Sequence, residues 1–137
     1  MATINRFEDL NVWRESRIQA QTIYLQIISN DVIKDYPIKD QTNRSSASVM
    51  DNIAEGFDRK GNKEFKHFLT ISLGSNSELK SQIYRAFDRS YIDQSSFDQL
   101  ILRNENISKM ITGFMKYLSK TELKGTKFLI EEPEMDY

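Results

Sequence analysis

Residues 48–65, SVMDNIAEGFDRKGNKEF, contain the end of one predicted helix, a polar turn and the start of a second helix. The apolar residues before the turn recur every four positions, which is the spacing of one helix face: Val49, Ile53 and Phe57. Gly56 is the expected helix terminator, because glycine tolerates left-handed dihedrals. Residues 58–62, DRKGN, form the turn, and Asn62 is the expected N-cap of the second helix.

The same periodicity continues outward and predicts four helices, at about residues 9–29, 38–57, 62–89 and 95–119. Ser95 with Asp98 three positions later matches a capping box at the start of the fourth helix. Short connections between amphipathic helices are typical of an up-down bundle. We therefore expect an all-α, antiparallel four-helix bundle over residues 1–120, followed by a flexible acidic tail over residues 121–137.

The apolar pattern also predicts which helix faces are buried. In the first helix the stripe comprises Leu10, Trp13, Ala20, Tyr24 and Ile27. In the second it comprises Ile38, Thr42, Ser45, Ser46, Val49, Ile53 and Phe57, and its small residues permit a close helix approach. Further apolar residues lie outside the narrow seams: Val12, Ile23, Ile28, Ile71 and Leu73. A second copy of the chain is the economical cover for them, so a homo-oligomer is expected.

Composition limits the classes of protein and of site. The 137 residues suit one domain and include no cysteine and a single histidine, His67, so thiolate and histidine-cage metal sites are not expected. No signal core or run of about 18 apolar residues occurs, so we expect no membrane span and a cytoplasmic location. The net charge is −1, but residues 130–137 carry four acidic side chains; the remaining 19 basic and 16 acidic residues give +3, which is compatible with a polyanionic partner.

The sequence offers no constellation for catalysis. It has no Gly-rich phosphate loop, nucleophile elbow or zinc-protease motif. Glu64 and His67 have the Glu-x-x-His spacing of di-metal bundles, but a second such pair is missing, so we expect a solvated Glu64 and a partly exposed His67. We expect no catalytic residues, no metal, no cofactor and no small-molecule substrate.

The basic residues around the turn are the candidate nucleic-acid-binding set: Arg44, Arg59, Lys60, Lys63 and Lys66. Side chains of this kind neutralise phosphates and release counterions. The alternative is a solubilising helix face. Asn52 and Glu55 share one helix face. They form a solvated helix end, a polar pair that fixes the helix–turn geometry, or a contact to a partner chain.

Three stretches resemble a known family: FEDLNVW at 7–13, SVMDNIAEGFDRKGNKEF at 48–65 and FLTISLGSNSEL at 68–79. They are similar to the four helix bundle proteins encoded in intervening sequences of bacterial 23S rRNA genes. The resemblance implies an antiparallel four-helix bundle, a ring-shaped homopentamer, and a structural or interface role for Asn52, Glu55 and Gly56. A related branch, the accessory variability determinants of diversity-generating retroelements, binds a reverse transcriptase and its template RNA.

This chain departs from the family pattern in the second helix. It has Asn43 and Arg44 where two arginines are common, Ser45 and Ser46 in place of alanines, and Met50 in place of a frequent proline. One basic group is therefore missing from that helix. The expected function is non-enzymatic binding of RNA or a ribonucleoprotein by an oligomeric bundle. The alternative is an oligomeric protein-interaction scaffold without nucleic-acid binding.

Overall fold

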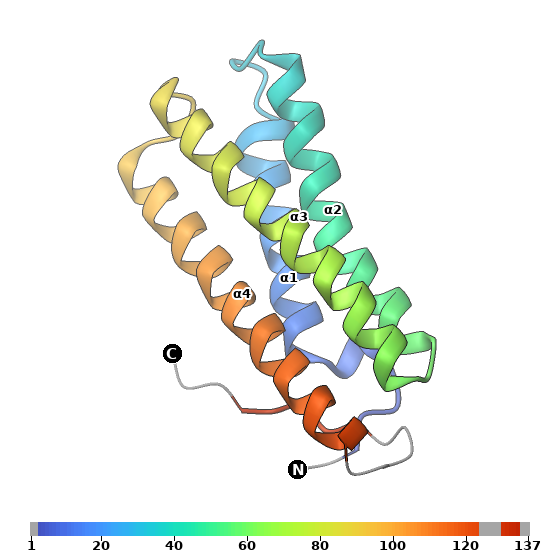
Figure 1. The fold of residues 1–137 in the computed structure, drawn as a ribbon. Helices are drawn as coiled ribbons and strands as arrows, with labels where there is room; N and C mark the ends of the chain where they lie inside the picture. Colours follow the sequence, from blue (N-terminus) through green and yellow to red (C-terminus); the bar gives the residue numbers. More distant parts are fainter. Residues whose placement is uncertain (1–2, 124–129, 135–137) are drawn as a thin grey trace.

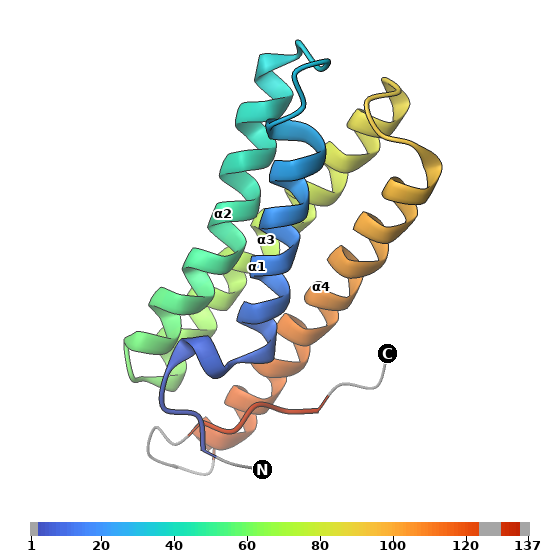
Figure 2. The same ribbon diagram turned by 180° about the vertical axis from the view of Figure 1, so that it is seen from behind.

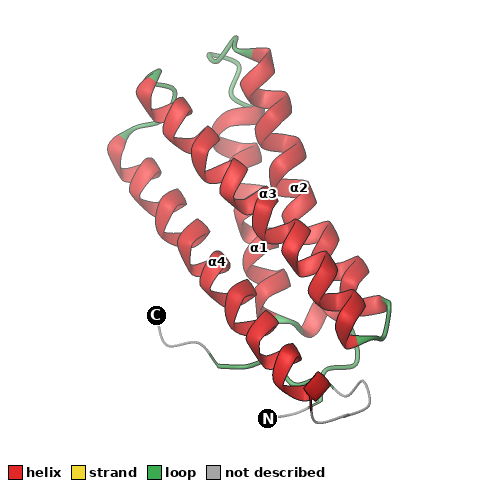
Figure 3. Ribbon diagram, viewed as in Figure 1, coloured by secondary structure: helices red, strands yellow, loops and turns green. Residues whose placement is uncertain are grey.

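The computed structural model describes residues 3–123 and 130–134. A short 3-10 helix, η1 (Phe7–Asp9), precedes α1 (Asn11–Ile23), which continues as a π-helical turn, η2 (Tyr24–Ile28). The other helices are α2 (Tyr36–Asp58), α3 (Asn62–Asp88) and α4 (Gln94–Leu123). Over the described ranges the chain forms no β-strand beyond an isolated bridge between Ile4 and Ile130 (Figure 3).

The four long helices form an up-down bundle in which successive helices run in opposite directions (Figures 1 and 2). α1 packs against α2 and α4, and α3 packs against the same two helices, so the backbones of the diagonal pairs lie farther apart. The α2–α3 turn, the start of α1 and the end of α4 lie at one end of the bundle. The all-α fold and the four helices predicted from the periodicity are therefore confirmed.

Three predicted helix ends are wrong. Gly56 does not terminate α2, which continues to Asp58; the left-handed residue of the turn is Lys60, with φ 61°. The N-cap of α3 is Gly61 rather than Asn62. At the start of α4, the Asp93 carboxylate accepts the Ser96 N–H at 2.8 Å, so the helix begins before the expected Ser95 capping box.

α2 and α3 approach closely along a seam of small residues. A Cβ atom on Gly56 would lie 2.5 Å from the Cβ of Phe68, so this position excludes every side chain. Farther along the seam, the Ser48 and Ser75 hydroxyls lie 2.7 Å apart. The buried Ser72 hydroxyl donates to the Val49 carbonyl at 2.7 Å. The expected close approach of the second helix is confirmed, and the Ser48, Ser72 and Ser75 hydroxyls are paired across the seam.

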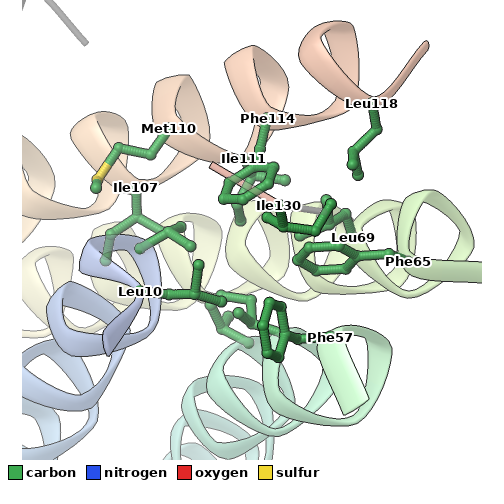
Figure 4. Packing of buried hydrophobic residues seen from close by; sticks show 13 residues of the cluster. Leu10, Phe57, Phe65, Leu69, Ile107, Met110, Ile111, Phe114, Leu118 and Ile130 are labelled. Atoms are coloured by element: carbon green, nitrogen blue, oxygen red, sulfur yellow. The ribbon is translucent and has the colours of Figure 1, made fainter. Parts of the chain in front are cut away.

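The core consists of two apolar clusters separated by a buried polar layer. One cluster, at the end with the α2–α3 turn, includes Ile53, Phe57, Phe65, Leu69, Ile111 and Phe114 (Figure 4). The other includes Ile23, Ile27, Ile38, Leu79, Ile83 and Leu100. Between them, the fully buried Gln19 amide donates to Asn76 Oδ1 at 2.9 Å. Asn104 donates to the same Oδ1 at 3.0 Å, so α1, α3 and α4 are joined by one network.

This layer explains why the predicted stripe of the first helix is only partly right: Leu10 and Ile27 are fully buried, as expected. The buried residues of α1 are Val12, Ser16, Gln19 and Ile23. Ser16 and Gln19 are polar, so an apolar pattern does not find them, and Tyr24, which was assigned to the stripe, is exposed. Val12 and Ile23, which were expected to need cover from a second chain, are fully buried within one chain.

At the end of the bundle opposite the α2–α3 turn, Asp35 links the α1–α2 connection to the α3–α4 connection. Its carboxylate accepts the Ile38 N–H at 3.2 Å at the start of α2. It also accepts Arg89 Nη1 at 2.6 Å and the Tyr91 hydroxyl at 3.0 Å from the α3–α4 connection. Desolvation raises the pKa of Asp35, but these hydrogen bonds outweigh it and hold the pKa below its ordinary value of 3.8.

Residues 130–134 lie beside the N-terminal segment (Figure 2). Ile130 is buried in the first apolar cluster, and its carbonyl accepts the Ile4 N–H at 2.7 Å. Glu132 accepts the Asn11 and Val12 N–H groups at 2.5 and 2.9 Å, so its carboxylate caps α1. Burial raises the pKa of Glu132, although the two N–H groups favour its ionised form.

The flexible tail expected over residues 121–137 stays a prediction. Thr121 to Leu123 continue α4, so that helix is longer than the sequence indicated. Residues 130–134 have the contacts described above, whereas residues 124–129 and 135–137 lie outside the described part of the chain.

Replacing Gly56 by alanine tests the α2–α3 seam. The added methyl group cannot fit beside Phe68, so we expect the free energy of unfolding to fall by about 1–3 kcal/mol in urea denaturation. Gly74→Ala is the matched control, because a Cβ there meets nothing within 4 Å; it should stabilise α3 by about 0.5–1 kcal/mol. Equal changes in the free energy of unfolding for the two variants would contradict the close approach of α2 and α3 at Gly56.

Asp35→Asn tests the tie between the two connections. Because the folded state lowers the pKa of Asp35, the carboxylate stabilises the fold above pH 3.8, and this stabilisation is lost as the pH falls through the lower, folded-state pKa. In thermal unfolding followed from pH 7 to pH 2, the variant should melt lower than wild type at neutral pH, and the difference should shrink in acid. A pH-independent difference would refute the role of the charge.

Ile130→Ala tests whether the C-terminal segment belongs to the core. Truncating a buried isoleucine should destabilise the protein by about 2–5 kcal/mol in chemical denaturation. Val32→Ala is the control, because Val32 is 87% exposed in the α1–α2 connection and should change stability little. If both variants unfold as wild type does, Ile130 does not fill this site in solution.

Candidate nucleic-acid interface

Three lysines from two helices line one groove. Lys63 and Lys66 lie on the first turns of α3, and Lys116 lies on α4 near its end. Because α3 starts where α4 ends, the antiparallel pairing brings these residues together at the bundle end that holds the α2–α3 turn. The groove therefore brings Lys116 beside Lys63 and Lys66, although the sequence separates it from them by about 50 positions.

Hydroxyl groups and apolar side chains complete the groove. Its lining also includes His67, Thr70, Leu73, Thr112, Met115 and Ser119. Lys66 Nζ donates to the Ser119 hydroxyl at 3.4 Å, which links α3 to α4 across the groove. Ammonium and hydroxyl groups at this spacing are suited to phosphate oxygens. No acidic side chain is among the described residues that line this groove.

Arg59 and Lys60 belong to the turn and have local contacts. Arg59 pairs with Glu55 at 2.9 Å, and its guanidinium lies 5.3 Å from the centroid of the Phe68 ring. The Lys60 ammonium lies 4.6 Å from the centroid of the Phe57 ring. Both remain exposed at the same bundle end as the groove, but local interactions hold each of them.

Arg44 does not join these residues. It lies fifteen positions before Arg59 on α2, about 22 Å along the helix axis. It pairs with Asp40 at 3.6 Å and lines a separate pocket of the α2–α3 surface together with Ser48 and Ser75. The basic set from the sequence is thus divided into a groove pair, a turn pair and the isolated Arg44.

Lys116 is the residue that sequence reasoning missed. Its position in the chain, far from the basic turn, does not indicate that it lines the same groove as Lys63 and Lys66. Only the antiparallel pairing of α3 with α4 would have indicated it, since residues near the start of one helix then face residues near the end of the other.

Asn52 and Glu55 have different roles in the fold. The Asn52 amide donates to the Ser48 carbonyl at 2.8 Å and to its hydroxyl at 3.0 Å, and that hydroxyl contacts Ser75. Glu55 is exposed and pairs with Arg59. Asn52 therefore supports the α2–α3 seam, and Glu55 holds the first residue after α2. Contact of either with a partner chain stays a prediction.

The described residues include no group of three or more histidine, aspartate or glutamate side chains placed to hold a metal ion. Glu64 and His67 are both exposed, and the His67 ring packs edge-on against Phe68. None of the described helices is long and apolar enough to cross a membrane.

Comparison with known proteins identifies relatives of this bundle. A family model described as 23S rRNA-intervening sequence protein matches residues 8–113. A solved structure from Bacteroides thetaiotaomicron, a protein of unknown function from the S23 ribosomal protein family, is similar with a TM-score of 0.69 and 20% identity. The match covers 77% of this chain and 98% of that one, and at this identity it supports the fold alone. No curated protein matches the chain.

Proposed function

Because the chain belongs to the 23S rRNA-intervening sequence protein family, we propose that it is a non-enzymatic, oligomeric bundle that binds the phosphate backbone of RNA in the cytoplasm. The observation that carries this proposal is the convergence of Lys63, Lys66 and Lys116 on one groove. Neither the family description nor that of the solved relative names an enzymatic activity.

The groove favours backbone contacts over base readout. Lysine is a compact point charge that suits phosphate, whereas planar bidentate recognition of bases uses arginine or amide side chains. Three exposed tyrosines of the described residues lie at helix ends away from the groove: Tyr24 in η2, Tyr36 at the start of α2 and Tyr84 near the end of α3. They are therefore not placed to stack bases there. Arg59 and Lys60 extend the positive surface beyond the end of the groove.

The charge of one copy sets the expected affinity. Three phosphate contacts correspond to a slope of about −2 to −3 in log affinity against log salt concentration. A single copy should therefore bind weakly at physiological salt. An oligomer repeats the groove in every subunit, and linked sites gain from a high effective concentration. Self-association thus belongs to the proposed function.

Exposed apolar residues support self-association, but they differ from those expected. Ile18 and Leu25 on the α1–η2 helix are 44% and 59% exposed, and Leu102 on α4 is 62% exposed. Of the residues first expected to need cover, Ile71 is exposed, whereas Ile28 and Leu73 are partly buried against the core clusters. The same apolar side chains favour the second candidate function, a protein-interaction scaffold without RNA.

Removing the groove charges tests RNA binding. The Lys63→Gln, Lys66→Gln, Lys116→Gln triple variant should bind a labelled structured RNA at least tenfold more weakly at low salt, and its salt dependence should be flatter, because about three phosphate contacts are lost. Fluorescence anisotropy at several salt concentrations measures both. Circular dichroism should show unchanged helicity.

The control removes the same charge elsewhere, in the Arg17→Gln, Lys34→Gln, Lys80→Gln variant. It should keep the wild-type salt slope and nearly all of the affinity. Equal losses in both triple variants would mean that net charge, not the groove, binds RNA. No binding by the wild-type protein even at low salt would reject the RNA proposal and favour the scaffold.

A further inference from the structure

The C-terminal segment, residues 130–134, occupies a surface that has the features of a peptide-binding site. That surface comprises the N-terminal segment around Ile4, the start of α1 and the end of α4. Residues 124–129 separate this segment from α4 in the sequence. Ile4, Asn11 and Val12, the hydrogen-bond partners described above for the segment, lie about 120 positions away from it in the sequence.

The segment is held mainly by two sets of contacts. One is a main-chain bridge to Ile4 that directs the Ile130 side chain into the core beside Phe65 and Leu69 (Figure 4). The other is the α1 N-terminus, whose free N–H groups receive the Glu132 carboxylate, as expected for an anion at a helix dipole. The Glu131 N–H also donates to the Tyr117 hydroxyl at 3.1 Å. Together they specify an extended peptide with an aliphatic residue two positions before a glutamate.

We propose that this surface also binds the C-terminal segment of a second copy of the chain, so that subunits are joined by exchange of residues 130–134. Exchange of an identical element preserves every contact made within one chain, so its free-energy cost is small. The six residues 124–129 span up to about 20 Å when extended, which allows the segment to reach a neighbouring subunit.

The groove beyond the segment supports a second copy as the occupant. Glu132, Pro133 and Glu134 line a pocket with Arg14, Ile18 and Met110. The α1–α4 surface continues past this pocket to the exposed Leu102, beside Glu15 and Arg103. A subunit that delivers its C-terminal segment here would bring its own surface against these uncovered apolar residues. This inference is independent of RNA binding.

Cross-linking distinguishes exchange from docking within one chain. The chain has no cysteine, so Arg14→Cys and Glu134→Cys each introduce a unique thiol, and both positions line the same pocket. The two single-cysteine variants are mixed, partially unfolded and refolded together, and treated with a short bismaleimide. Exchange predicts a covalent product of twice the 16.1 kDa chain mass.

Two controls make every outcome decisive. In the double variant Arg14→Cys, Glu134→Cys, exchange predicts cross-linked dimers and higher products, whereas docking within one chain gives a cross-linked monomer. Mixing Glu134→Cys with Val32→Cys, at the opposite bundle end, should give no product. Cross-linked monomer from the double variant with no product from the mixture overturns the proposal, and so does the absence of any cross-link.

A binding measurement tests the recognition itself. A fluorescein-labelled peptide of residues 128–137 should bind saturably to a chain ending at residue 129, provided circular dichroism shows that this chain is folded. Peptides with Ile130→Ala or Glu132→Gln should bind at least tenfold more weakly. If the truncated chain does not fold, the full-length chain in excess peptide serves instead, and the peptide should reduce the cross-linked dimer of the mixture. Equal effects of all three peptides would overturn the recognition.

Discussion

A Cβ atom on residue 56 would lie 2.5 Å from the Cβ of Phe68, so α2 and α3 reach their observed separation only because residue 56 is glycine. Interiors are packed as densely as organic crystals and do not absorb such an overlap. Between this contact and the α2–α3 turn, Phe57 and Phe65 pack edge-on at 5.8 Å between ring centroids and close the bundle end. On the side of Gly56 away from the turn, the contacts of Ser48, Ser72 and Ser75 continue the same close approach along the two helices.

The seam determines where the candidate site lies. α3 begins at Asn62, immediately after the turn, so its first exposed face carries Lys63 and Lys66. The opposite face presents Phe65 and Leu69 to the core, where Phe114 of α4 lies 5.1 Å from Phe65 between ring centroids. That contact fixes how α4 lies against α3 and thereby places Lys116 across the groove. Apolar packing thus brings together three lysines from two helices.

Sequence patterns predicted the helices well because apolar residues recur along most of them, as at Ile53 and Phe57. They found the buried Thr42, Ser45 and Ser46 of α2. They missed Gln19, Asn76 and Asn104, which satisfy one another only after three helices meet. They also gave Gly56 the wrong role, because a glycine near the end of a helical pattern fits both a helix terminator and a close contact between two helices. Lys63 and Lys66 were identified from the basic turn, whereas Lys116 and the docking of Ile130 depend on tertiary pairing that no local spacing encodes.

Amide hydrogen exchange, followed residue by residue, tests the central role of the α2–α3 seam most directly. If the seam is the constraint on which the rest depends, amides flanking Gly56, Ser48 and Ser72 should exchange only through global unfolding, with protection equal to the free energy of unfolding. Amides of α1 and of the first turns of α4 should exchange earlier, through partial opening. Faster exchange along the α2–α3 seam than in α1 or α4 would contradict the account.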